Sequence, residues 1–271
     1  MTGEALEARG IDVGYGERLV LPDLSVRLVA GEITALIGPN ACGKSTLLRA
    51  LARLLKLTSG SVLLDGEDIH ALPTREVARR LGILPQSPLA PESITVGDLV
   101  WRGRHPHQRF GQRRSAADEE AVIDALLATG TAELVSRRVD SLSGGQRQRV
   151  WISMALAQQT PYLLLDEPTT FLDIAHQLDV LDLLVDLNAQ RGTSIVLVSH
   201  DLNQAARYAH TVIAMRDGRI RGHGRPADVL TPELINDVFG LTADVAPHPV
   251  TGHPFVYPLG RHDRVTRKES P

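Results

Sequence analysis

The sequence predicts an α/β fold in which a mostly parallel β-sheet forms the core and a helical segment is inserted into it. Short apolar runs that stop at glycine or polar residues alternate with helical periodicities along much of the chain. At residues 38–45 a glycine-rich turn joins one of these runs to a helical pattern. Residues 88–160, in contrast, contain helical patterns but no clear strand. These three observations favour one α/β core interrupted by a helical subdomain.

Four apolar runs predict the strands of the core. Ile33–Ile37, Tyr162–Leu165 and Ser194–Val198 are almost continuously apolar, as expected of strands that are buried on both faces of a parallel sheet. The fourth run, residues 212–215, is followed by the turn Asp217-Gly218 and then by a further short run. This last pattern predicts an antiparallel hairpin.

Helical patterns lie between and beside these strands. Leucines recur on one face of residues 45–55 and on one face of residues 178–187. Within the strand-free segment, residues 96–100 and 116–128 show helical patterns as well, and prolines separate its parts. Because strands and helices alternate, we expect helices on both faces of the sheet.

The chain therefore divides into four parts. Residues 1–87 and 161–240 are predicted to form the two halves of the core, and residues 88–160 the inserted helical subdomain. Residues 241–271 are predicted to be a tail, because they are rich in proline, glycine and charge, and the tail is expected to fray from Arg261.

Composition limits the cellular setting and the partners. The chain has 29 Lys+Arg against 32 Asp+Glu, so its charge provides no argument for a nucleic-acid partner, and none is expected. A single cysteine excludes a disulfide within the chain and fits a reducing compartment. We find no signal-peptide pattern and no apolar run of the ~20 residues that a membrane span needs. We therefore expect a cytoplasmic protein whose membrane role, if any, comes through a partner.

The glycine-rich turn has the pattern of a phosphate-binding loop, G-x-x-x-x-G-K-[ST], in the strand-to-helix context that this motif requires. Backbone N–H groups of such a loop and the N-terminus of the following helix bind phosphate oxygens. Lys44 is placed to reach the β- and γ-phosphates, and the Ser45 hydroxyl to bind Mg²⁺. The alternative is a glycine-rich turn with a chance lysine. The candidate nucleotide-binding residues here are Gly38, Pro39, Asn40, Ala41, Cys42, Gly43, Lys44, Ser45 and Thr46.

Two carboxylates follow the strand Tyr162–Leu165, at the end where open α/β sheets bind ligands. Adjacent residues of a strand point to opposite sides, so the two acids need not share a task. Asp166 is predicted to bind Mg²⁺ and Glu167 to polarise the attacking water. The alternative is an exposed acidic turn.

A second candidate anion site precedes the helical run 147–158. Ser143-Gly144-Gly145-Gln146 places a capping serine and two glycines at a helix start. With the other motifs, this segment resembles the ATP-binding-cassette family. The resemblance implies a P-loop NTPase core with an antiparallel N-terminal β part. It also implies a head-to-tail homodimer, in which this segment of one subunit closes over the MgATP that the other subunit holds.

Other motifs follow in the order of that family, and the resemblance covers residues ~8 to ~240. By this resemblance Gln86 senses Mg²⁺ and the transport partner, His200 contacts the γ-phosphate, and Tyr15 stacks on adenine. The segment Phe171-Leu172-Asp173 is similar to the loop at the dimer seam. Taken singly, each of these residues has an ordinary structural alternative. Ala41 stands where the family usually has glycine, so a left-handed conformation there would be strained by ~1 kcal/mol.

The subgroup follows from finer resemblances. The interval from Lys44 to Ser143 is too short for the long coiled coil of the DNA-repair members and lacks heptads. Four segments are similar to cassettes of the iron–siderophore, haem and cobalamin importers: residues 73–86, 103–107, 167–177 and 200–209.

The resemblance therefore implies an importer ATPase, for ferric siderophores in preference to haem or cobalamin. A soluble cassette acting on nucleic acid or ribosomes is a further alternative. The implied partners are a membrane permease and, through it, a substrate-binding protein. The ATPase would lie at the cytoplasmic face of the membrane.

Overall fold

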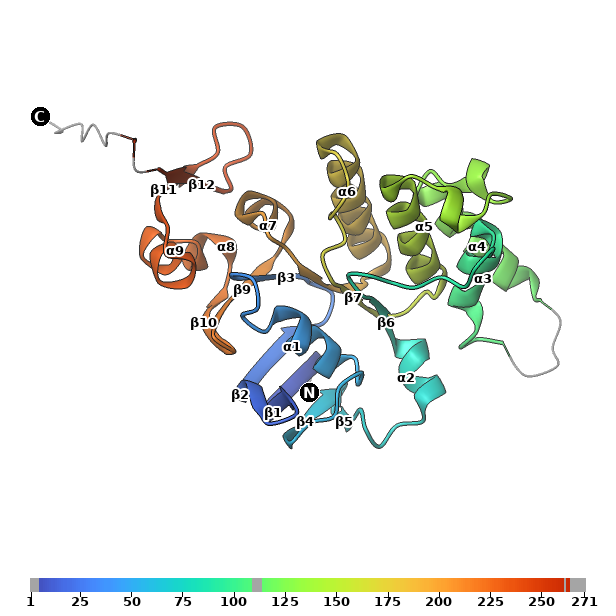
Figure 1. Ribbon diagram of the computed structural model, residues 1–271, viewed down its shortest axis with the longest axis horizontal. Helices are drawn as coiled ribbons and strands as arrows, with labels where there is room; N and C mark the ends of the chain where they lie inside the picture. Colours follow the sequence, from blue (N-terminus) through green and yellow to red (C-terminus); the bar gives the residue numbers. More distant parts are fainter. Residues whose placement is uncertain (1–4, 109–113, 261, 264–271) are drawn as a thin grey trace, which may run out of the picture.

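The computed structural model describes residues 5–108, 114–260 and 262–263. Its centre is a six-stranded sheet in the order β10-β9-β3-β8-β7-β6 (Figure 1), parallel throughout except at the β10 edge. The strands are β3 (Ile33–Ile37), β6 (Leu81–Leu84), β7 (Tyr162–Leu165), β8 (Ser194–Val198), β9 (Thr211–Arg216) and β10 (Arg219–Gly224). The predicted strands and hairpin are therefore confirmed.

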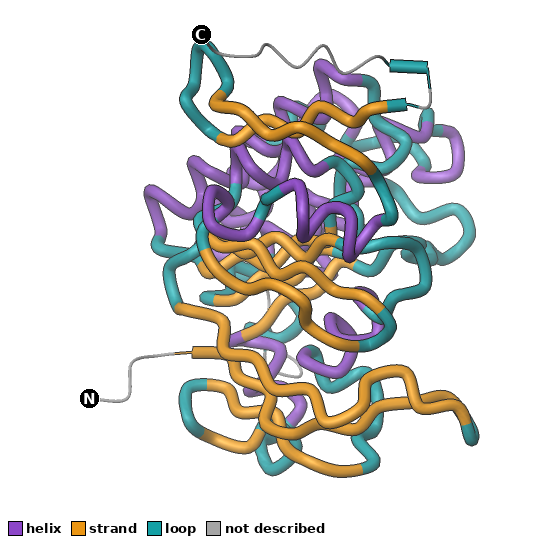
Figure 2. Tube along the Cα trace, turned by 90° about the vertical axis from the view of Figure 1, so that its left-hand side faces the viewer, coloured by secondary structure: helices purple, strands orange, loops and turns teal. Residues whose placement is uncertain are grey.

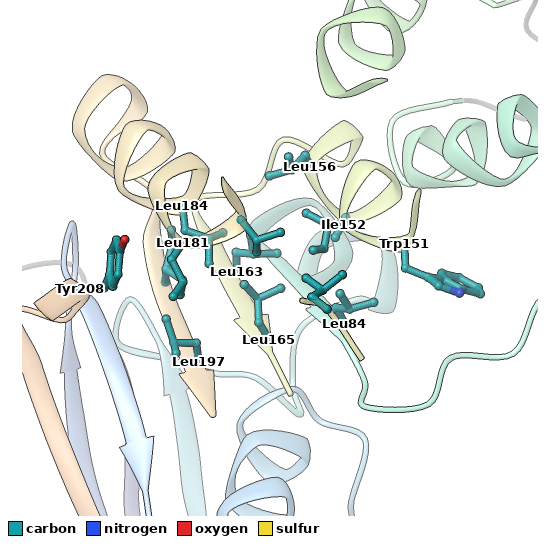
Figure 3. Packing of buried hydrophobic residues seen from close by; sticks show 14 of the residues in the cluster. Leu84, Trp151, Ile152, Leu156, Leu163, Leu165, Leu181, Leu184, Leu197 and Tyr208 are labelled. Atoms are coloured by element: carbon teal, nitrogen blue, oxygen red, sulfur yellow. The ribbon is translucent and has the colours of Figure 1, made fainter. Parts of the chain in front are cut away.

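Alternate residues of each central strand belong to two different cores. In β7, Leu163 and Leu165 face one apolar cluster, whereas Tyr162 and Leu164 face the other. The first cluster contains residues of α5 (Gly144–Ala157), α6 (Ile174–Arg191) and α7 (Leu202–Tyr208), and Figure 3 shows Leu163 and Leu165 packed against this helical layer. Burial on both faces explains why these strands are apolar at every position.

The second cluster lies between the central sheet and an antiparallel N-terminal sheet, with α1 (Lys44–Leu51) inside it. This sheet has the order β2-β1-β4-β5 and forms a separate layer (Figure 2). Its strands are β1 (Ala5–Tyr15), β2 (Arg18–Val29), β4 (Ser59–Leu64) and β5 (Glu67–Asp68). The predicted antiparallel N-terminal part is confirmed.

Between β6 and β7 the described residues form helices and turns. The predicted helices at 96–100 and 116–128 correspond to α3 (Val96–Trp101) and α4 (Ala116–Ala128), and α5 follows. Three short 3-10 turns connect them: η1 (Arg102–Arg104), η2 (Ala132–Leu134) and η3 (Val139–Ser141). Within 88–108 and 114–160 there is no ladder strand, only an isolated bridge between Thr95 and Arg138.

Two predicted helices have other limits in the structure. The helix predicted at 45–55 ends at Leu51, because Arg53 turns to a positive φ of 59°. The Arg53 guanidinium then donates to the carbonyls of Ile69 and Leu72. The helix predicted at 178–187 is longer, since α6 begins after the capping residue Asp173 and ends at Gly192, whose φ is 64°.

The C-terminal part contains more structure than the predicted tail. After α8 (Pro226–Val229) and α9 (Pro232–Phe239), the strands β11 (Thr242–Pro247) and β12 (Pro254–Leu259) form an antiparallel hairpin. The fraying predicted from Arg261 concerns residues that, apart from 262 and 263, lie outside the described ranges. No helix in the described part of the chain combines the length and apolar character needed to cross a bilayer.

A buried ion pair holds the helices of the insert together. Arg104 donates through Nε to Asp118 Oδ1 at 2.9 Å and through Nη1 to the Ala157 carbonyl at 2.8 Å. The side chains of both charged residues are more than nine-tenths buried. Arg104 thus joins the end of α3, the start of α4 and the end of α5. Outside the insert, α2 (Thr74–Arg80) contacts the segment that follows Arg104, because Arg79 donates to the Pro106 carbonyl.

Replacing one partner of this pair should strongly destabilise the protein. Arg104→Ala leaves the Asp118 carboxylate buried without its counter-charge, so the free energy of unfolding should fall by about 3–5 kcal/mol. Urea denaturation followed by circular dichroism measures this change. Arg138→Ala is the control, because the Arg138–Asp140 pair is exposed and its loss should leave the urea midpoint unchanged. Equal midpoints for the two variants would contradict the structural role of Arg104.

Candidate functional site

A pocket of about 590 Å³ opens at the carboxyl ends of the central strands. Its lining residues come from the β1–β2 turn, the loop before α1, the loops after β6 and β7, and the loop before α7. They are Tyr15, Arg18, Val20, Asn40, Ala41, Cys42, Gly43, Lys44, Ser45, Thr46, Gln86, Glu167 and His200. Residues that the sequence analysis selected from five separate segments thus meet at one place.

The phosphate-loop candidates form a tight turn from β3 into α1. Gly38 and Gly43 have φ values of 151° and 109°. A Cβ at Gly38 would come within 2.2 Å of the Met215 carbonyl oxygen, so only glycine fits there. Ala41 has a φ of 60°, the left-handed conformation anticipated from its place in the loop. The turn therefore includes one strained position.

Lys44 is buried, with 5% of its surface exposed. Its ammonium group donates to the carbonyl oxygens of Gly38 at 2.8 Å and Pro39 at 2.9 Å. These contacts hold a positive charge against the inner side of the loop. Gly38 and Pro39 are not among the pocket-lining residues. They contribute to the site by accepting the hydrogen bonds of Lys44 through their carbonyl oxygens.

Ser45 and Asp166 come together although 121 residues separate them. The Ser45 hydroxyl donates to Asp166 Oδ1 at 2.9 Å. Asp166 is 1% exposed, and its Oδ2 is buried without a hydrogen-bond partner in the described structure. Burial raises the pKa of Asp166, and the hydrogen bond from Ser45 offsets only part of this rise. An orphaned carboxylate oxygen beside a hydroxyl is a donor set that suits a hard cation.

Glu167 has the opposite electrostatic environment. It accepts hydrogen bonds from His200 Nε2 at 2.5 Å, Gln86 Nε2 at 2.7 Å and Thr170 Oγ1 at 3.2 Å. Burial would raise the pKa of Glu167, but the interactions with His200, Gln86 and Thr170 outweigh it and lower the pKa below its ordinary value. Glu167 is therefore a carboxylate at neutral pH. Gln86, which the sequence analysis predicted to sense Mg²⁺, is one of these three donors.

The Ser143–Gln146 segment caps α5 and does not line the pocket. The Ser143 hydroxyl accepts from the Gln146 amide, and the Gln146 side chain accepts from the Ser143 amide, which forms a capping box. A Cβ on Gly144 or Gly145 would meet Phe171 or Leu172. None of the four residues lines the described pocket wall that contains Lys44.

Three residues with contacts at the site were not selected from the sequence. Arg18 and Val20 line the pocket beside Tyr15, which is 48% exposed, and Thr170 bonds Glu167. Tyr15 and Arg18 are paired in the β1–β2 register, so recognising that hairpin would have placed Arg18 at the pocket. Thr170 gives no comparable signal, because its contact depends on the turn after β7.

Comparison with known proteins places these features in a family. A family model described as "ABC transporter" matches residues 21–170. The ferric enterobactin transport ATP-binding protein of Escherichia coli is 51% identical over 263 residues, which cover 96% of this chain and 97% of that protein. The petrobactin import ATP-binding protein of Bacillus anthracis is 49% identical over 266 residues, covering 98% and 97%.

Solved structures agree with the sequence relatives. An ABC transporter in an inward-facing conformation superposes with a TM-score of 0.80 at 29% identity, covering 96% of this chain and 99% of that one. A dimeric bacterial ABC transporter cassette superposes with a TM-score of 0.73 at 27% identity, covering 82% and 98%. The similarity thus extends over the core, the insert and most of the remaining chain.

The strained alanine of the loop provides a stability test. Ala41→Gly removes a Cβ from a left-handed position but increases the entropy of the unfolded chain. These effects oppose each other, so the free energy of unfolding should change by no more than about 1 kcal/mol. Ala50→Gly, inside α1, has no strain to relieve and should lower it by about 1 kcal/mol or more. Thermal denaturation compares the two, and equal losses would be evidence against strain at Ala41.

Proposed function

This chain belongs to the ABC transporter family, as an ATP-binding subunit, and we propose that it hydrolyses MgATP to power an importer for ferric siderophores. The motif resemblance found in the sequence is confirmed by the family match and by relatives of about half-identical sequence. The observation that carries the enzymatic part of the proposal is the convergence of Lys44, Ser45, Asp166, Glu167 and His200 at the carboxyl ends of parallel strands.

ATP binding follows from the shape and charge of the pocket. The loop from Gly38 to Ser45 presents backbone N–H groups at the start of α1, where phosphate oxygens are favoured. On binding, Lys44 would exchange its carbonyl acceptors for the β- and γ-phosphates, a stronger charge-assisted contact. The exposed ring of Tyr15 would stack on the adenine. Arg18, at the same wall, would add a positive charge near the nucleotide.

Ser45 and Asp166 are the residues best suited to hold Mg²⁺, since an unpartnered carboxylate oxygen lies beside a hydroxyl. Gln86 would join them after leaving Glu167. Bound there, Mg²⁺ would neutralise charge that develops on the β- and γ-phosphate oxygens.

Glu167 is proposed to activate the attacking water. Its lowered pKa keeps it ionised, so it can accept a hydrogen bond and then a proton from water that attacks the γ-phosphorus. The bond from this phosphorus to the bridging oxygen breaks, and ADP leaves. His200, which bonds Glu167 at 2.5 Å, orients that carboxylate and would contact the γ-phosphate. A dual role of this kind would make the loop before α7 sensitive to the nucleotide state.

The site is proposed to be completed by a second copy of the chain. Ser143, Gly144, Gly145 and Gln146 form an anion-binding helix start that lies apart from their own nucleotide pocket. In a head-to-tail homodimer they would close over the nucleotide of the partner. The exposed side chain of Phe171, whose Cβ lies next to Gly144, and that of Ile174 would then be covered at the seam. A dimeric cassette among the similar solved structures supports this arrangement.

The membrane link is proposed to run through the insert. Residues 88–110, which follow Gln86, are proposed to receive a permease helix, and of these 109 and 110 lie outside the described residues. Leu89 is 94% exposed, so its apolar side chain is accessible to a helix of the permease. The subunit would therefore lie at the cytoplasmic face of the membrane, and a binding protein would deliver the cargo to the permease. Nothing in the proposed site touches the cargo, so its identity rests on the relatives.

Glu167→Gln should separate binding from hydrolysis. The amide keeps the shape of the side chain and loses the base, so turnover should fall by about a hundredfold or more. MgATP binding should persist, and the variant should accumulate as a closed dimer, which light scattering detects. Glu120→Gln, on the exposed face of α4, should behave as wild type. A Glu167→Gln chain that stays monomeric at saturating MgATP would argue against the dimer.

The cargo can be assigned by stimulation of ATP turnover. The chain is reconstituted with its permease and binding protein in lipid nanodiscs, and ferric siderophore, haem, cobalamin or free iron is added. We expect ferric siderophore to raise turnover severalfold, because loaded binding protein favours the state in which the dimer closes. Stimulation by haem or cobalamin alone would replace the cargo and keep the importer. Stimulation by DNA or ribosomes, without any response to the permease, would overturn the importer itself.

A further inference from the structure

The C-terminal hairpin is attached to the first turn of α7, close to His200. The Asn203 side chain accepts from the Val256 amide at 2.7 Å and donates to the Val256 carbonyl at 3.3 Å. One side-chain amide thereby satisfies both backbone groups of a β12 residue, in the manner of a neighbouring strand. Val256 is buried, so the loss of these bonds would leave polar groups unpaired away from water.

Apolar packing supports the same attachment. Val256 forms a small core with Ile235 of α9 and Ala243 of β11, and Leu202 and Phe239 pack against it. Leu202 is the first residue of α7, two positions after His200. Figure 2 shows the hairpin as a layer over the helices, and Figure 1 places β11 and β12 beside α7 and α9. The hairpin therefore contacts the start of α7 both by apolar packing and by hydrogen bonds.

The first turn of α7 is held on its other side as well. Asp201 caps the helix by accepting from the amides of Asn203 at 2.8 Å and Gln204 at 3.0 Å. The Gln204 side chain donates to Gln177, whose own amide donates to the carbonyls of Thr169 and Leu172. This turn thus connects the hairpin to the segment that follows Glu167.

His200 stands at the junction of these contacts. Its side chain is half exposed, and its ring reaches Glu167 across a wall that two pockets share. The second pocket, about 480 Å³, is lined by His200 and Glu167 on one side and by Leu241, Val256 and Pro258 of the C-terminal region on the other. The orientation of the His200 ring therefore depends on the contacts that fix the first turn of α7.

We propose that Asn203 is a positioning residue for hydrolysis: by binding Val256, it lets the C-terminal hairpin fix the turn that aims His200 at Glu167. This inference rests on the ATPase function proposed above. It assigns Asn203 no contact with nucleotide, because Asn203 does not line the described nucleotide pocket. It also gives the C-terminal hairpin a part in turnover that the predicted tail did not have.

The test compares Asn203→Ala with Asn236→Ala in the full chain. Asn236 lies in the last turn of α9 and donates to the Leu241 carbonyl at 3.4 Å, so its loss loosens the same region without removing a bond to α7. We measure kcat and KM for ATP, with kcat normalised to the sites that bind a non-hydrolysable ATP analogue. Asn203→Ala should lower kcat by about tenfold, because a small misplacement of a catalytic group is costly. KM should stay within about twofold, since the phosphate loop is untouched.

Asn203→Asp provides a graded variant. A carboxylate can still accept from the Val256 amide but cannot donate to its carbonyl, so kcat should fall between those of wild type and Asn203→Ala. Unchanged kcat in Asn203→Ala, or an equal loss in Asn236→Ala, would overturn the inference and leave the proposed function standing. A parallel rise in KM would also overturn it, because it would indicate general loosening of the site. A wild-type chain that hydrolyses no ATP, alone or with its permease, would instead overturn the proposed function.

Discussion

Burial of both faces of the central parallel sheet is the interaction on which the rest of the structure depends. Alternate side chains of β3, β7 and β8 lie in two apolar clusters. One cluster is between the sheet and the helices, and the other is between the sheet and the N-terminal sheet. Parallel strands covered in this way must be joined by crossovers, so the loops that follow them emerge at one edge. Lys44, Gln86, Glu167 and His200 each lie in or directly after such a loop. The pocket is thus a consequence of how the sheet is covered.

At the pocket, two adjacent carboxylates have different electrostatic environments. Asp166 continues the direction of β7 into the interior, where burial raises its pKa and a hydroxyl is its partner. Glu167 takes a left-handed φ of 54°, which turns it toward three hydrogen-bond donors that lower its pKa. The roles proposed for them, holding Mg²⁺ at Asp166 and accepting a proton at Glu167, therefore fall to groups with opposite pKa shifts, although only one peptide bond lies between the two residues.

Polar side chains that bind backbone carbonyls fasten both peripheral parts to the core. Arg79 of α2 donates to the Pro106 carbonyl of the insert, and Gln158 returns a bond to the Ala78 carbonyl. Asn203 binds the hairpin in the same manner. Such contacts are directional and few, unlike the apolar packing of the core. Both peripheral parts also share apolar packing with the core, so these hydrogen bonds act together with buried contacts to hold the insert and the hairpin in place.

The sequence alone determined the parallel core, the helices of the insert and nearly all residues of the pocket. It could do so because apolar runs, glycine turns and the motifs that bind phosphate are local, and each is recognisable within a few residues. Helix ends were harder to predict: α1 ends at Leu51, just before Arg53, whose left-handed turn is stabilised by carbonyls 16 and 19 residues further on. Only tertiary structure decided that Gln86 and His200 both bond Glu167, that Arg18 stands beside Tyr15, and that the C-terminal residues form a hairpin on α7. These contacts join residues far apart in the chain, and no local pattern encodes a partner that folding alone brings near.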